Sequence, residues 1–111
     1  MANPKFEIFK GQDDQFYFRL RAKNDEIILQ SEGYEAKGGC QNGIESVKTN
    51  APVDERYKRS ISSNDKWYFA LKAANLETIG MSEMYESEQN RENGIESVKE
   101  NAPISPIEDT T

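Results

Sequence analysis

The sequence contains no histidine and one cysteine, Cys40. Histidine is the commonest general base and metal ligand, so its absence excludes Ser-His-Asp and Cys-His catalytic arrangements. A single cysteine cannot form an internal disulfide, which fits a reducing compartment, and it cannot supply the ligands of a zinc site. Cys40 falls on an apolar helical spacing, which favours a buried, inert thiol over a reactive one. We therefore expect no catalytic residue, no metal and no cofactor.

Long hydrophobic runs are also missing. No run approaches the ~18 residues of a membrane span, and the N-terminal stretch MANPKFEIFK lacks the apolar segment of a signal peptide. The glycines of EGYEAKGGCQNG have neither Walker nor dinucleotide-binding spacing, so no phosphate-binding loop is expected. These absences predict a cytoplasmic protein that does not act at a membrane.

The chain has no excess of positive charge. Its net charge of -6 weighs against tight nucleic-acid binding, which depends on neutralising phosphates. Residues 1–51 carry 7 basic and 8 acidic side chains, whereas residues 52–111 carry 7 and 12. The first half is therefore nearly neutral and has room for a local basic strip that the total charge hides.

The sequence contains an internal duplication. NGIESVKTNAP at residues 42–52 recurs 51 positions later as NGIESVKENAP at residues 93–103, and the same offset aligns the chain without gaps from Phe16 to Pro103. Two copies of about 50 residues are each too small to bury an adequate core alone. We expect a single domain over residues 1–111 in which both copies share one sheet and one core. The first repeat would span about 5–52 and the second about 56–103, with a terminal strand and tail at 104–111.

Each copy is predicted to begin with strands. KFEIF at residues 5–9 is a short first strand. Apolar and polar residues then alternate from Phe16 to Lys23 and again from Trp67 to Lys72, the period of a strand with one apolar and one polar face. Asn24-Asp25 fits a tight hairpin turn into a further strand, EIILQ.

A helix is predicted at the end of each copy. In the first copy, apolar residues recur at helical spacing from Ala36 through Cys40 to Ala51. In the second copy, the helix is expected from about Glu83 to about Asn101, with Ser82 as its N-cap.

The repeated motif carries a glycine and a proline in each copy. Gly43 and Gly94 recur inside the predicted helices despite the low helix propensity of glycine, which indicates a close backbone approach to the sheet or to the other helix. Pro52 and Pro103 are expected to end the helices and to begin extended segments.

The sequence carries a tandem pattern that consists of an aromatic strand followed by LKA, SEGY and NGIESVK.NAP. In this pattern the sequence resembles the YegP-like family of uncharacterised small bacterial proteins. The resemblance implies an α+β fold in which two β(3)-α-β repeats share one mainly antiparallel sheet. Both helices would cover one face, and the C-terminal strands would be exchanged between the halves. The sequence departs from the family pattern at Asn24-Asp25 and Asn75-Leu76, where a glycine is common. The resemblance therefore does not imply the geometry of these two hairpins. The resemblance implies no activity.

Two surfaces are candidates for binding. On the sheet face opposite the helices, the strand alternation places Tyr17, Arg19, Arg21, Tyr68 and Lys72. On the helix surfaces, four polar positions repeat in each copy: Asn42, Ser46, Lys48 and Asn50, and Asn93, Ser97, Lys99 and Asn101. Both sets are also consistent with ordinary solvated surfaces.

Three functional hypotheses remain open. The first is a non-catalytic interaction module that docks another macromolecule, such as a protein, as a monomer or a strand-swapped dimer. The second is a binder of small molecules or single-stranded nucleic acid that uses the aromatic and basic sheet face. Ala70 and Ala74 replace Arg19 and Lys23 in the second copy, which counts against a symmetric nucleic-acid surface. The third is an enzyme that uses only the abundant carboxylates, and it requires a cleft where the two halves meet.

Overall fold

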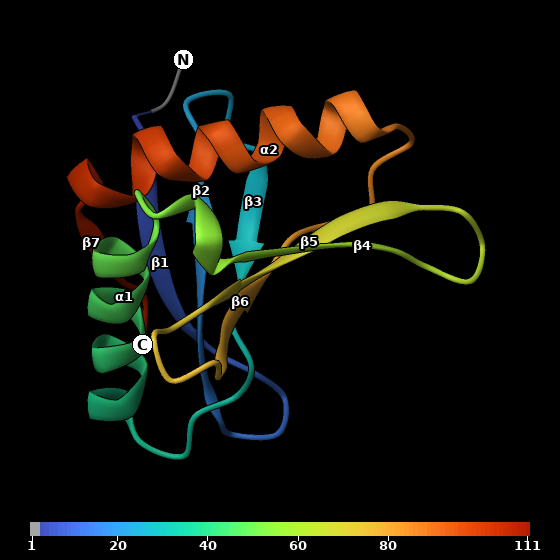
Figure 1. The fold of residues 1–111 in the computed structure, drawn as a ribbon. Helices are drawn as coiled ribbons and strands as arrows, with labels where there is room; N and C mark the ends of the chain where they lie inside the picture. Colours follow the sequence, from blue (N-terminus) through green and yellow to red (C-terminus); the bar gives the residue numbers. More distant parts are fainter. Residues whose placement is uncertain (1–2) are drawn as a thin grey trace.

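Seven strands form one mixed sheet against which two helices pack in the computed structural model, which describes residues 3–111 (Figure 1). The strands are β1 (Lys5–Lys10), β2 (Phe16–Arg21), β3 (Ile27–Gln30), β4 (Tyr57–Ile61), β5 (Trp67–Lys72), β6 (Thr78–Met81) and β7 (Ile107–Asp109). The helices are α1 (Lys37–Asn50) and α2 (Glu88–Asn101), and a 3-10 turn follows each of them, η1 (Asp54–Arg56) and η2 (Ala102–Ile104). The predicted α+β class is confirmed.

The strand order is β4-β5-β6-β3-β2-β1-β7. All neighbours are antiparallel except β1 and β7, which run parallel. In the centre of the sheet Gln30 of β3 pairs with Met81 of β6, and these two residues stand 51 positions apart. An antiparallel pair of equivalent residues defines a pseudo-two-fold axis, which relates β2 to β5, β3 to β6 and α1 to α2.

One hydrophobic core lies between the sheet and the two helices. Phe6, Phe18 and Phe69 of the strands are fully buried against Ile44 of α1 and Ile95 of α2. Each fully buried side chain of this size contributes about 1.5–3 kcal/mol, so a core assembled from both copies supplies what one copy alone lacks.

Helix α2 begins later than the sequence predicts. It starts at Glu88 rather than at about Glu83, and its N-cap is Ser87 rather than Ser82. In the first copy, Ala36 is the N-cap of α1 and the rest of the predicted apolar stripe is buried. The helices therefore start at equivalent positions in the two copies.

The residues just before α2 are held extended by the sheet. Tyr85 exchanges two backbone hydrogen bonds with Trp67 of β5, of 2.7 and 2.9 Å. The hydroxyl of Ser82 accepts a hydrogen bond from the Phe69 N–H, 2.9 Å away, and so cannot cap a helix. These contacts join residues about 13–18 positions apart, and they override the helix-forming composition of the segment.

The sequence predicts extended segments that begin at Pro52 and Pro103. In the structure, a short 3-10 turn comes first in each case. Pro103 lies inside η2, and η1 begins two residues after Pro52. The fixed φ of proline suits the start of a helical turn, so a short 3-10 turn forms before each following strand.

Two hairpin turns use a non-glycine residue where the sequence resemblance suggests glycine. Asp25 has φ 69° and Leu76 has φ 71°, both in the left-handed region. Aspartate tolerates this region better than leucine, whose Cβ crowds the following carbonyl at a cost of about 1–2 kcal/mol.

Leu76→Gly is expected to stabilise the protein by about 1 kcal/mol, because it relieves this strain and the Leu76 side chain is 74% exposed and so packs little. Urea unfolding would measure the change. Asp25→Gly is the matched control and is expected to gain less, and an equal gain at both turns would contradict the strain assigned to leucine.

Candidate functional site: the outer face of the sheet

The sheet face opposite the core carries the five predicted residues, and all five are partly exposed. One row of paired residues crosses this face from edge to edge: Lys58, Ala70, Met81, Gln30, Arg19, Glu7 and Glu108. The row runs from a cation at the β4 edge to two carboxylates at the β1–β7 edge. The two halves of the face therefore differ in charge although their folds are equivalent.

In the first half, Glu7 forms ion pairs with the cations of the basic strip. The Nε atoms of Arg19 and Arg21 both donate to Oε1 of Glu7 at 2.7 Å, and Lys5 Nζ lies 3.5 Å from Oε2. Burial by itself raises the pKa of Glu7, but the hydrogen bonds from Arg21 and Arg19 outweigh it and lower the pKa to about 2. Glu7 is 8% exposed. The two arginines are therefore engaged within the protein.

Tyr17 is engaged in a similar way. Its hydroxyl donates to Asp13 at 2.6 Å, a hydrogen bond that raises the pKa of Tyr17. Its ring stacks on Phe9 with 5.6 Å between the centroids, and the Arg19 guanidinium lies 4.3 Å from the Phe9 centroid. The aromatic and basic groups of the first half thus satisfy one another.

In the second half, the sign of the charge at the matched position is reversed. Lys58 stands where the first half has Glu7, and Lys72 stands where it has Arg21. Neither lysine forms an ion pair with any carboxylate of residues 3–111. The strand register places Lys58 opposite Ala70 and Tyr68 opposite Ser60 on the same face. This half combines unpaired lysines with a half-buried tyrosine.

Sequence reasoning did not identify Glu7 or Lys58. The internal duplication could have identified both residues. If the alignment at the 51-residue offset is extended by ten residues toward the N-terminus, FEIFK in β1 aligns with YKRSI in β4. The alternation within each strand would then have placed both side chains on the outer face.

Most of the repeated helix positions have structural roles. Asn50 and Asn101 are buried rather than exposed, and each donates from Nδ2 to the carbonyl one helical turn earlier at 2.8 Å. These bonds tie each asparagine side chain to the last turns of its own helix. The same bonds extend to the hydroxyls of Ser46 and Ser97 at 3.3 and 3.1 Å.

The two motif lysines cover core aromatic rings. Lys48 Nζ lies 5.8 Å from the Phe6 centroid, and Lys99 Nζ lies 5.7 Å from the Tyr57 centroid. Lys99 also pairs with Asp54 at 2.8 Å. The remaining motif positions, Asn42 and Asn93, are exposed.

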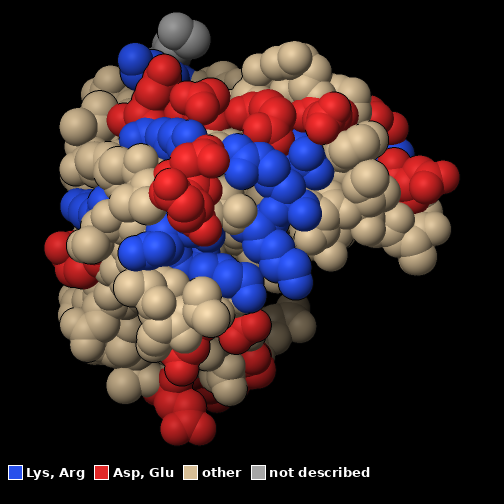
Figure 2. All heavy atoms as spheres, in the orientation of Figure 1, with Lys and Arg blue, Asp and Glu red and all other residues tan. Residues whose placement is uncertain are grey.

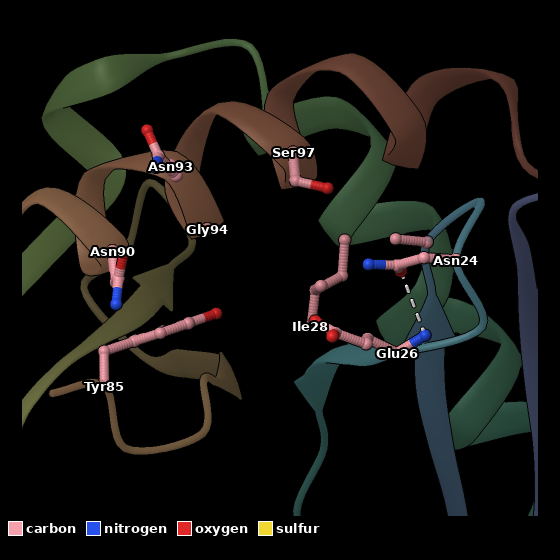
Figure 3. A pocket seen from close by; sticks show the side chains of 9 residues that line it. Asn24, Glu26, Ile28, Tyr85, Asn90, Asn93, Gly94 and Ser97 are labelled. Atoms are coloured by element: carbon pink, nitrogen blue, oxygen red, sulfur yellow. Dashed lines mark hydrogen bonds between the residues drawn. The ribbon is translucent and has the colours of Figure 1, made fainter.

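A groove of about 340 Å³ lies where the two copies meet (Figure 3). The Tyr85 ring extends into it from one side and Ile28 faces it from the other (Figure 3). The β2–β3 turn contributes Asn24 and Glu26, while Asn90, Asn93 and Ser97 come from α2. Glu26 is the one carboxylate in this lining, so the groove does not hold the pair of carboxylates on which the third hypothesis depends.

Other chemistry-bearing groups of residues 3–111 are few. Cys40 is fully buried, and burial raises the pKa of its thiol to about 11, with the nearby Asp109 carboxylate adding to the effect. No group of three or more acidic, histidine or cysteine side chains in residues 3–111 is placed to hold a metal ion. Within the same range, neither helix combines the length and apolar character needed to cross a membrane.

Comparison with known proteins identifies the family. The model of a domain of unknown function, DUF1508, matches residues 12–57 and again residues 62–109. A UPF0339 protein of Shewanella oneidensis is 52% identical over 106 residues, covering 96% of each chain. The UPF0339 protein YegP of Escherichia coli K12 is 49% identical over 106 residues, again covering 96% of each chain.

Two solution NMR structures of relatives have the same fold. The UPF0339 protein of Shewanella oneidensis superposes with a TM-score of 0.91 at 50% sequence identity, over 98% of this chain and 92% of that one. YegP of Escherichia coli superposes with a TM-score of 0.93 at 47% identity, over 100% of this chain and 96% of the other. The resemblance to YegP-like proteins is thus confirmed: the chain belongs to the DUF1508 (UPF0339) family of bacterial proteins of unknown function.

Proposed function

We propose that this protein is a non-catalytic interaction module that docks an acidic partner protein on the second half of the outer sheet face. One observation carries the proposal: Glu7 pairs with both arginines of the first half, whereas the matched position in the second half is Lys58, which has no carboxylate partner in residues 3–111. A cationic site that its own chain leaves unpaired is complementary to an external anion.

The surroundings of Lys58 favour a protein over a nucleic acid. Ala70 and Met81 continue the row from Lys58, where the first half has Arg19 and Gln30. Met81 is 38% exposed, so the basic residues flank an apolar strip, a combination typical of protein-docking surfaces. Single-stranded nucleic acid would draw on many cations, and both Arg19 and Arg21 are already bound to Glu7.

The double variant Lys58→Glu with Lys72→Glu is expected to weaken binding of a polyglutamate probe at least ~10-fold, because each reversed exposed charge changes the interaction by about 1 kcal/mol. Amide NMR titration of the labelled protein would measure this. In the native protein the shifts should saturate and centre on β4 and β5.

Lys10→Glu with Lys23→Glu is the matched control, since it makes the same change in net charge with exposed lysines of the first repeat. This control should bind polyglutamate nearly as well as the native protein. Equal loss in both double variants would indicate a mere charge effect and refute the proposed face. Equal or stronger saturable shifts with oligothymidylate would favour the nucleic-acid hypothesis instead.

A second candidate function is the binding of a small polar molecule in the groove between the copies. Asn90 beside the Tyr85 ring and Asn24 on the opposite side of the groove favour it, because polar amides and an aromatic surface line the same space (Figure 3). Shifts centred on Tyr85 upon addition of a metabolite fraction, lost in Tyr85→Leu, would support this candidate over the sheet face.

The proposal includes the chain organisation. We propose one domain with repeats at about 5–52 and 56–103, and an exchange of C-terminal strands within one chain. The exchange is supported by β4, which follows α1 but pairs with β5, and by β7, which follows α2 but pairs with β1. We also propose a cytoplasmic location, in keeping with the single cysteine.

A further inference from the structure

The sheet is one strand short of its own pseudo-symmetry. The axis relates β6 to β3, β5 to β2 and β4 to β1, and β7 lies on the outer edge of β1. Within residues 3–111, no strand occupies the matching place beside β4, which ends the sheet. The β4–β5 hairpin extends away from the rest of the sheet (Figure 1), and basic side chains gather in the region of β4, beside the acidic side chains of η1 (Figure 2).

The outer edge of β4 resembles the edge by which β1 holds β7, except for one backbone N–H that is already used. On β1, the Phe6 N–H donates to the Pro106 carbonyl at 2.8 Å, and the Ile8 carbonyl accepts from the Thr110 N–H at 3.0 Å. The matched residues of β4 are Tyr57 and Arg59. Tyr57 N–H is already used, because it donates to the Asp54 carbonyl.

Arg59 and Ile61 direct their backbone groups outward from β4. Ser62 N–H donates to the Lys66 carbonyl at 2.7 Å, which fixes Ser62 as a residue that bonds toward β5. Bonding alternates along an antiparallel strand, so Ser60 and Lys58 also bond toward β5, while Arg59 and Ile61 direct their N–H and C=O groups away from it. Ile61 is 52% exposed and adds an apolar contact at the same edge.

We propose that the outer edge of β4 binds an extended segment of a partner protein that places a carboxylate beside Lys58, and that this segment adds in parallel as an eighth strand. The preference for acid rests on the proposed function, whereas the strand geometry rests on the β1–β7 pair. Addition of a strand to an open sheet edge is a common mode of peptide recognition, in which backbone bonds supply affinity and alternate side chains supply specificity.

The chain's own β7 indicates which residues the segment should carry. Glu108 pairs with Glu7 in register and is held by Lys5 at 3.0 Å. At the β4 edge, the same position faces Lys58, so a carboxylate is more favourable there than on β1. The next residue, Asp109, is bound by Lys37, whose counterpart is Glu88. A carboxylate at that second position is therefore disfavoured, and a basic or neutral residue fits.

The charges at this edge also exclude a second copy as the occupant. Two β4 edges placed together would bring Lys58 and Arg59 of each copy against like charges, the device by which edge strands avoid self-pairing. Arg59 is held on the helix side by Asp54 and Glu92, both at 3.0 Å, so its backbone stays accessible.

A synthetic peptide of residues 104–111 and its variants test the proposal against the full-length protein. The Asp109→Lys peptide should bind more tightly than the parent, with saturable NMR shifts and slowed hydrogen exchange at the Arg59 and Ile61 amides. The peptide with Asp109→Lys and Glu108→Lys should bind at least ~10-fold more weakly. Shifts at Phe6 and Ile8 instead would mean that the peptide replaces β7, and would overturn the proposal.

Backbone methylation separates strand addition from simple charge attraction. An N-methyl group at Thr110 removes the hydrogen bond equivalent to that accepted by Ile8 and should weaken binding at least ~10-fold, whereas N-methylation at Asp109, on the opposite edge of the strand, should leave binding nearly unchanged. Binding that depends on Lys58 but tolerates both methyl groups would keep the proposed function and refute the eighth strand. Self-association of the protein without peptide, mapped to β4, would refute the choice of occupant.

Discussion

Gly43→Ala is expected to destabilise the protein by about 2 kcal/mol, although alanine is the better helix former. A Cβ atom at Gly43 would lie 2.5 Å from the Tyr34 hydroxyl oxygen and 2.9 Å from a ring carbon of Phe18. Both rings are packed against the core, so the helix would have to move away from the sheet. Urea unfolding followed by circular dichroism would measure the loss in the free energy of unfolding.

Gly38→Ala is the control within the same helix. Beyond its chain neighbours and the helix's own backbone, no atom lies within 4 Å of the Cβ that this change adds, so the improved helix propensity should stabilise the protein by up to about 1 kcal/mol. The opposite signs of the two substitutions are the central expectation. Equal stability of the Gly43→Ala and Gly38→Ala variants would show that the close approach of Tyr34 to the helix does not affect the free energy of unfolding.

Acidification is expected to remove about 2 kcal/mol of stability through Glu7 alone. The pKa of Glu7 is about 2 in the folded protein, below its ordinary value of 4.5. A lowered pKa stabilises the folded state above about pH 4.5, and this contribution is lost progressively as the pH falls toward 2. The full shift corresponds to roughly 3 kcal/mol, which solvent screening of the partly exposed arginines reduces.

The difference in unfolding free energy between the native protein and Glu7→Gln isolates this effect. The difference should be largest at pH 6 and shrink steadily from pH 4.5 to pH 2.5. Comparing the two proteins is necessary because Asp54, with hydrogen bonds from Lys99 and Arg59, also has a pKa lowered to about 2. Glu35→Gln, at an exposed position, should change stability by less than about 0.5 kcal/mol at every pH. A constant difference across the range would refute the role of Glu7.

The features that sequence reasoning predicted correctly are those with a local period. Alternation identified β2 and β5, and the helical stripe through Cys40 identified the buried face of α1, because each pattern is complete within one element. The duplicated motif is also explained by local packing. Its glycine makes room for a tyrosine, its asparagine and serine hydrogen-bond within the helix, and its lysine covers a core ring.

The features that were missed depend on contacts between distant residues. The late start of α2 follows from the backbone pairing of Tyr85 with Trp67, which no helix propensity reports. The outer face was predicted to expose Arg19 and Arg21, yet their carboxylate partner comes from another strand, β1. Ion pairs between neighbouring strands can be predicted only when the order of the strands in the sheet is known. The sequence of a single strand does not contain that order.

The parallel pair of β1 and β7 joins residues about 100 positions apart, since Phe6 stands in register with Ile107. Synthesis begins at the N-terminus, so the nascent chain contains β1 long before its outer neighbour exists. Until residues 107–109 have left the ribosome, the growing sheet therefore has two bare edges instead of one. The outer edge of β1 therefore stays open for most of the synthesis of residues 1–111, and contacts of such long range are intrinsically slow to form.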